Sequence, residues 1–108
     1  MADVAMVLEA LNSPTRRQIL DLLREDERSV RSLTDALEVS QPAVSQHLRV
    51  LRDARLVTHR PQGASNLYRL DRDGLHLVRR WVESFWDDAL AAFVAHTETV
   101  ETERNEQP

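Results

Sequence analysis

The stretch SQPAVSQHLRVLR, residues 40–52, predicts a helix with an unusual surface. Ser40 can accept a hydrogen bond from a free backbone N–H, and Pro42 falls in the first turn, where its missing N–H needs no partner. Apolar residues then recur at helical spacing and predict one narrow buried stripe: Val44, Leu48 and Leu51. The intervening side chains are polar or positively charged, and no acid occurs before Asp53. Such a surface favours a negatively charged partner with polar edges, and duplex DNA fits.

The net charge of −4 would by itself argue against a nucleic-acid partner. The charge is unevenly distributed, however. Residues 40–70 hold five arginines and one acid, whereas the rest of the chain holds nine arginines and seventeen acids. Segregation of this kind focuses a positive field on one surface of an acidic protein.

Length and composition limit the remaining possibilities. We expect one domain over residues 1–97, followed by an acidic disordered tail over residues 98–108. The absence of cysteine excludes disulfides and thiolate metal sites. We see no signal peptide and no run of about 20 apolar residues that could span a membrane, so we expect a soluble, cytoplasmic protein.

The residues before the opening stretch predict three shorter helices. The first covers residues 4–11, and Ser13 with Pro14 starts the second. We interpret residues 24–28 as a solvated charged turn, and residues 29–31 are compatible with a small strand. A third helix of about two turns follows from Ser32. Two short helices joined by three or four residues, the second polar outside, form a helix-turn-helix pattern.

The residues after it predict a hairpin and a long final helix. Residues 56–60 and 67–70 are β-type runs that flank residues 61–66, which are rich in turn formers. A hairpin directly after a helix-turn-helix is a wing, here with a flexible, uncharged tip. The alternative is a plain hairpin that completes the core, which leaves the lack of acids at the tip unexplained.

The final helix is predicted to begin at Asp71 or Asp73 and to end near Thr97. Its apolar residues form a band about 80° wide with further apolar flanks, more than one small domain needs to cover. We therefore predict a symmetric homodimer, with the first helix contributing; the alternative is a central helix of a monomer. The expected interface residues are Val4, Val7, Leu8, Leu11, Trp81, Phe85, Trp86, Ala89, Leu90 and Phe93.

Three blocks of this sequence resemble the ArsR/SmtB family of bacterial winged-helix repressors. They are LNSPTRRQIL at residues 11–20, SQPAVSQHLRVL at residues 40–51, and Leu56-Val57 with a glycine-bearing wing that ends at Leu70. The resemblance implies a mainly α (α+β) winged helix-turn-helix fold of α-α-α-α-β-β-α order. It also implies a homodimer that binds an imperfect palindromic operator in double-stranded DNA. Family members usually repress, and many release DNA when an inducer binds.

The sequence departs from the metal sites of that family. Thiol sensors carry Cys-x-Cys on the third helix, where this chain has residues 30–33, VRSL. Another family site uses Asp and His on the final helix, but His76 and His96 lie about 160° apart on the helical wheel. We therefore expect no cofactor. A regulator that responds to nickel, zinc or cobalt through N and O ligands is left open, and no small-molecule effector is identified.

The first turns of a recognition helix approach base edges, so we expect Gln41, Ser45 and Gln46 to read bases. His47 either contacts a base or packs against the core with one nitrogen on a phosphate. The arginines of this helix are expected to bind phosphates. The polar and positively charged residues of the wing are expected either to bind phosphates as well or to reach the adjacent minor groove. The complete predicted DNA-binding set is Ser40, Gln41, Ser45, Gln46, His47, Arg49, Arg52, Arg60, Gln62 and Arg69.

Two other function classes compete with this interpretation. An enzyme is not expected, because no cysteine, no glycine-rich phosphate loop and no Ser/His/Asp set is visible. A protein-interaction module could use the winged fold and the aromatic last helix without DNA. Within the regulator class, the sequence does not decide between repressor and activator.

Overall fold

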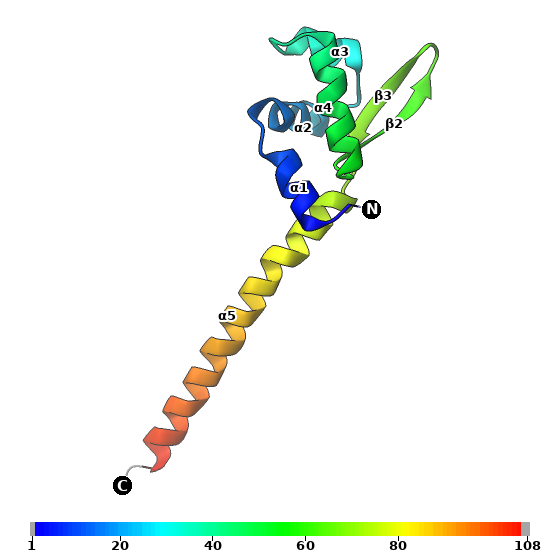
Figure 1. Cartoon of the computed structure of the whole chain (residues 1–108). Helices are drawn as coiled ribbons and strands as arrows, with labels where there is room; N and C mark the ends of the chain where they lie inside the picture. The colour runs from blue at the N-terminus through cyan, green and yellow to red at the C-terminus, as the bar shows by residue number, and fades with distance from the viewer. Residues whose placement is uncertain (1, 107–108) are drawn as a thin grey trace. The chain divides into compact units, whose positions relative to one another are not determined.

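The computed structural model describes residues 2–106, with side chains for residues 2–97. The chain divides into two compact units, Met1–Val78 and Arg79–Pro108. The predicted order of elements is confirmed (Figure 1). The elements are α1 Val4–Leu11, α2 Pro14–Glu25, β1 Arg28–Ser29, α3 Val30–Ala36, α4 Gln41–Asp53, β2 Val57–Gln62, β3 Ser65–Leu70 and α5 Asp73–Glu106. The small strand considered for residues 29–31 is present as β1, but it covers residues 28–29, and residues 30 and 31 belong to α3.

Side-chain caps fix where the helices start. The Ser13 hydroxyl accepts a hydrogen bond from the Arg16 N–H at 3.3 Å, and the Ser40 hydroxyl accepts one from the Ala43 N–H at 3.3 Å. Both predicted caps are thus confirmed. Helix α3 begins two residues earlier than predicted, because Ser29 caps it by accepting from the Ser32 N–H at 3.1 Å.

The core of the first unit joins all of its helices to the sheet. The predicted stripe of α4 is confirmed, since Val44, Leu48 and Leu51 are at most 1% exposed. The other buried residues of the core are Val7, Ala10, Ile19, Leu23, Leu33, Ala54, Leu56, Val57 and Tyr68. Val7 was expected at a dimer interface, and that expectation is wrong: its side chain is fully buried within the chain. The apolar side of α1 is used internally, against α2 and α4.

The sheet has three antiparallel strands in the order β1-β3-β2. Strand β1 pairs Arg28 with Tyr68, and Arg24 and Glu25 belong to α2, so the predicted solvated turn over residues 24–28 is wrong at both ends. The hairpin is also tighter than predicted. Its strands extend to Gln62 and Ser65 because Gly63, with φ +60°, permits a two-residue turn.

Helix α5 starts against the turn between α4 and β2. The Asp71 carboxylate accepts from the Asp73 N–H at 3.0 Å, and the Gly74 N–H donates to the Arg55 carbonyl at 2.8 Å. A Cβ atom on Gly74 would overlap the carbonyl oxygen of Ala54, so only glycine fits this approach.

At its other end α5 continues to Glu106, beyond the predicted end near Thr97. Residues 98–106 of the predicted disordered tail are therefore part of α5, and residues 107–108 lie outside the described residues. No helix in the described part of the chain is both long and apolar enough to cross a membrane.

The second unit presents a broad apolar surface along α5. Seven large hydrophobic side chains are between 42% and 66% exposed: Trp81, Val82, Phe85, Trp86, Leu90, Phe93 and Val94. The rings of Trp81 and Phe85 meet edge to face with centroids 5.1 Å apart. Ala89 is exposed as well.

Candidate nucleic-acid interface

The exposed side of α4 carries the residues that the sequence predicted to read DNA. Gln41, Ser45, Gln46, Arg49 and Arg52 are all exposed, on the side of the helix opposite its buried stripe. The cap residue Ser40 is exposed too. Hydrogen-bond donors and acceptors of this helix therefore face outward, with two guanidinium groups and no carboxylate until Asp53.

A shallow pocket of about 440 Å³ lies between α4 and β3. Its lining consists of Pro42, Ser45, Gln46, Arg49, Arg52 and Tyr68. Arg49 and Arg52 thus bring two positive charges to the same hollow as two of the predicted base-reading residues. This arrangement suits a phosphate group beside an exposed base edge.

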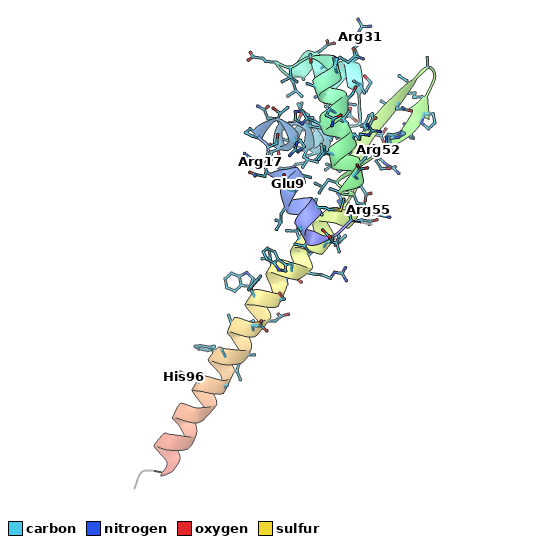
Figure 2. All side chains as sticks on the ribbon, in the orientation of Figure 1. Glu9, Arg17, Arg31, Arg52, Arg55 and His96 are labelled. Atoms are coloured by element: carbon cyan, nitrogen blue, oxygen red, sulfur yellow. The ribbon has the colours of Figure 1, made fainter. Side chains whose placement is uncertain are left out.

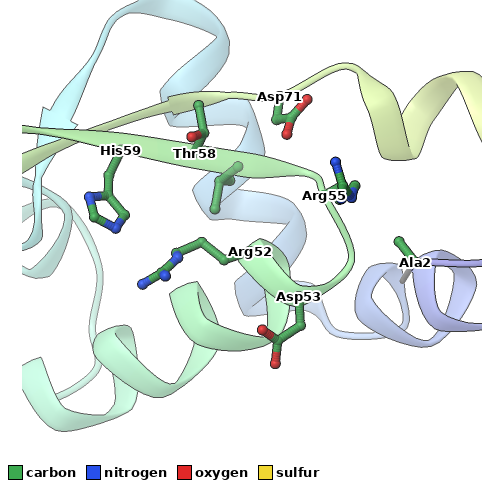
Figure 3. Close-up of a pocket in the computed structure, with 8 residues that line it drawn as sticks. Ala2, Arg52, Asp53, Arg55, Thr58, His59 and Asp71 are labelled. Carbon is green, nitrogen blue, oxygen red and sulfur yellow. The ribbon is translucent and has the colours of Figure 1, made fainter.

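Arg52 also lines a second open pocket, of about 340 Å³, where α4 meets β2. Figure 3 shows Arg52 reaching from α4 toward His59 on β2, with Arg55, Asp53 and Asp71 nearby. The mixture of two acids and two arginines makes this pocket a poorer anion site than the one beside Tyr68.

The wing places its arginines on one face of the sheet. Paired residues of neighbouring strands project to the same face, and the register pairs Thr58 with Arg69 and Arg60 with Leu67. Arg60 and Arg69 therefore share a face, while Arg28, Tyr68 and His59 share the other.

On the arginine face, Arg60 already has an acidic partner. Its guanidinium forms an ion pair of 3.1 Å with the carboxylate of Glu27, from the connection between α2 and β1. The contact between the two segments, 33 residues apart, could not be expected from local sequence. Arg69 and Gln62 are exposed on the same hairpin.

His47 differs from the other predicted reading residues because it is half-buried. Its Nδ1 lies 3.4 Å from Nη1 of Arg16 on α2. Burial lowers the pKa of His47 below its usual value of 6.5, and the positive charge of Arg16 lowers this pKa further. The imidazole is therefore neutral at pH 7, without the charge that would strengthen a phosphate contact.

Sequence comparison identifies the family. The family model described as bacterial regulatory protein, arsR family, matches residues 13–59. The chain is 45% identical over 85 residues to the HTH-type transcriptional regulator Rv2034 of Mycobacterium tuberculosis, with 79% of each chain covered. It is also 45% identical over 85 residues to the HTH-type transcriptional repressor SmtB of that organism, with 78% of this chain and 63% of the repressor covered. This chain belongs to the ArsR family.

A solved structure agrees with the fold of this ArsR-family chain. The homodimeric winged helix-turn-helix DNA-binding domain Mb0332 of Mycobacterium bovis superposes with a TM-score of 0.62, at 34% identity and with 81% of each chain covered. The winged helix-turn-helix fold, predicted from the helix that starts at Ser32, the helix of residues 40–52 and the hairpin of residues 56–70, is confirmed. The ArsR-family chain is a transcriptional regulator, as its relatives are.

Several residues at the candidate nucleic-acid interface of this ArsR-family chain were not predicted from the sequence. Arg31 is exposed at the start of α3, on the same part of the first unit as α4 and the wing (Figure 2). Tyr68 lines the pocket between α4 and β3. Glu27 forms an ion pair with Arg60, and Arg16 contacts His47. The alternation of Leu67 and Tyr68 along a strand could have placed Tyr68 on the inner face, but the other contacts join distant segments.

A metal site of the kind considered from the sequence would need several His, Asp or Glu side chains close together. Within residues 2–97, no three His, Asp or Glu side chains come together in a way that could hold a metal ion. His76 and His96 are both exposed on α5.

Proposed function

We propose that this ArsR-family regulator is a repressor that binds an imperfect palindrome in double-stranded DNA as a homodimer. The observation that carries the proposal is the surface of α4, where the exposed side chains from Gln41 to Arg52, apart from Pro42 in the first turn, are polar or positively charged. Such a helix fits the major groove, where base edges present distinct hydrogen-bond patterns. The proposal includes neither catalysis nor a metal cofactor.

The exposed residues of α4 take separate roles in this proposal. Gln41, Ser45 and Gln46 read bases, because amides and hydroxyls pair with base edges in the major groove. Arg49 and Arg52 bind phosphates from the pocket beside Tyr68 and supply affinity without sequence information. From the wing, Arg60, Gln62 and Arg69 contact the adjacent backbone or minor groove.

The homodimer is supported by the exposed apolar surface of α5. A surface with seven exposed large hydrophobic side chains along one helix is unusual for a monomer in water and marks an interaction site. The same surface on a second copy can cover it across a two-fold axis, which is the commonest symmetry of soluble homo-oligomers. On α1, Val4 and Leu11 are half-buried and Leu8 is 39% exposed, so these three remain candidates for the interface.

The proposal is tested by a mobility-shift titration with the DNA upstream of the protein's own gene. A scrambled duplex of equal length and composition serves as the control. We expect binding to the upstream DNA at least 1,000-fold tighter than to the scrambled duplex, the lower end for specific recognition. Equal binding to the two duplexes would contradict it and favour the protein-interaction module.

The sign of regulation needs a second measurement. Transcription from the bound promoter is compared between the wild-type strain and a strain lacking the protein. A repressor gives higher transcription in its absence, and lower transcription would make the protein an activator.

A further inference from the structure

Arg16 connects three helices of the first unit. Its Nε donates to the Ala10 carbonyl at 2.6 Å, and its Nη2 donates to the Glu9 carbonyl at 3.1 Å. Both carbonyls lie in the last turn of α1, and that of Glu9 also accepts from the N–H of the cap residue Asn12 at 3.1 Å. The third group, Nη1, lies 3.4 Å from Nδ1 of His47 on α4. Arg16 is thus held at two points on α1 while it contacts the proposed reading helix.

The chemistry of the two side chains fixes the proton on the imidazole. An arginine side chain carries N–H donors and no acceptor. The hydrogen bond from Arg16 therefore requires a lone pair on Nδ1 of His47. A neutral imidazole with a lone pair on Nδ1 carries its proton on Nε2. Within the described part of the chain, no group accepts a hydrogen bond from His47.

We propose that Arg16 is a specificity-determining positioning residue: it locks His47 in the Nε2–H form, so that α4 offers the DNA a hydrogen-bond donor at this position. The inference rests on the proposed function, because it needs α4 to face the groove. A donor at Nε2 selects acceptors such as guanine O6 and N7 or thymine O4, and it disfavours the amino groups of adenine and cytosine.

The lowered pKa of His47 supports this assignment. A protonated imidazole has no lone pair on Nδ1 and would place two positive groups 3.4 Å apart. The contact is therefore compatible only with the neutral ring, which the direction of the pKa also favours.

The first test reads the proton position without DNA. Imidazole nitrogen shifts are measured by NMR in the full chain at neutral pH, for the wild type, Arg16→Met and Arg17→Met. Arg17 is the matched control, since it also donates to a carbonyl of α1, that of Leu11, at 2.7 Å, whereas the contact with His47 Nδ1 comes from Arg16. We expect the Nε2–H form of His47 in the wild type and in Arg17→Met, and a mixture of both forms in Arg16→Met. An Nδ1–H form in the wild type, or an unchanged spectrum in Arg16→Met, would overturn the proposal.

The second test reads base choice, and its two His47 variants leave the contacts between Arg16 and α1 in place. The amide nitrogen of glutamine reaches the position of Nε2 in histidine, whereas that of asparagine lies near Nδ1. We expect His47→Gln to keep the preference for the wild-type operator over single-base variants, and His47→Asn to lose about three- to tenfold of it, the range of one hydrogen bond. Arg16→Met should lose a similar factor while Arg17→Met keeps the preference. If His47→Asn kept the preference for the wild-type operator and His47→Gln lost it, the proposed Nε2–H form of His47 would be overturned.

The two tests separate failure of this inference from failure of the proposed function. If the wild type showed no base preference at all, the proposed function would fail together with the DNA half of the inference. If the wild type discriminates while Arg16→Met discriminates equally well, only the inference fails.

Discussion

Neighbouring residues on the reading surface have different surroundings, and these decide their roles. Gln46 is exposed, whereas His47 is half-buried and held by Arg16. Arg60 lies on the wing, and its guanidinium is paired with Glu27 of the first unit. The residue types could be read from the sequence, but these partners could not, because each comes from a segment far along the chain.

The Arg60–Glu27 ion pair should compete with DNA phosphate. Glu27→Gln removes the competitor, and we expect it to raise affinity for random duplex DNA about two- to fivefold, in line with an exposed ion pair. Arg60→Ala should lower that affinity and reduce the salt slope by about one. Titrations at several salt concentrations measure both effects. Glu25→Gln, which changes the net charge equally without touching Arg60, is the control; an equal gain in that variant would show a general charge effect instead.

The buried environment of His47 makes stability depend on pH. Because its pKa is lowered on folding, the unfolded chain binds more protons when the pH falls below about 6.5. The wild type should therefore lose stability between about pH 7 and pH 5.5, and His47→Gln should lose less over the same window. Urea unfolding at both pH values checks this. An identical loss in the two proteins would mean that His47 titrates normally.

At the level of elements, local signals predicted the helices well and the sheet poorly. Ser13 and Ser40 cap their helices as expected, because a cap bonds to a backbone group three residues away. Strand β1 has only two residues, and it forms because Arg28 pairs with Tyr68 of β3, which is distant in the sequence. Gly63 did carry the signal of a tight turn, but the density of turn formers around it suggested a longer loop.

The junction between α4, β2 and α5 depends on Gly74. In an exposed helix, replacing glycine by alanine stabilises by up to about 1 kcal/mol. Here a methyl group would meet the backbone oxygens of Ala54 and Arg55, so we expect Gly74→Ala to destabilise by about 1–3 kcal/mol. Chemical denaturation gives the change in free energy of unfolding. A stabilised Gly74→Ala protein would contradict the close approach.

At the level of the whole molecule, the apolar surface of α5 is the feature that the sequence placed best. Trp81, Phe85 and Trp86 are exposed as expected. Val7 was misplaced because helical periodicity marks an apolar side without telling whether that side packs within the chain or against a second copy. Only the fold distinguishes these two cases.

Assembly should fail when charge is placed on that surface. Phe85 is 58% exposed, and we expect Phe85→Glu to weaken dimerisation by at least about 2 kcal/mol, the size of an interface hot spot. Ala91→Glu adds the same charge on the opposite side of α5 and should leave the dimer intact. Sedimentation over a range of concentrations measures both. A wild type that stays monomeric at high concentration would contradict the homodimer.

The central claim is that α4 reads DNA from both copies of a symmetric dimer. It is tested most directly by selecting binding sites from random duplexes with the wild type and with Gln46→Ala. We predict an inverted repeat with half-site centres about 10–10.5 base pairs apart, and for Gln46→Ala a loss of about 1–3 kcal/mol of discrimination at one symmetric position. Selection of no motif, or of an identical motif by both proteins, would contradict the account.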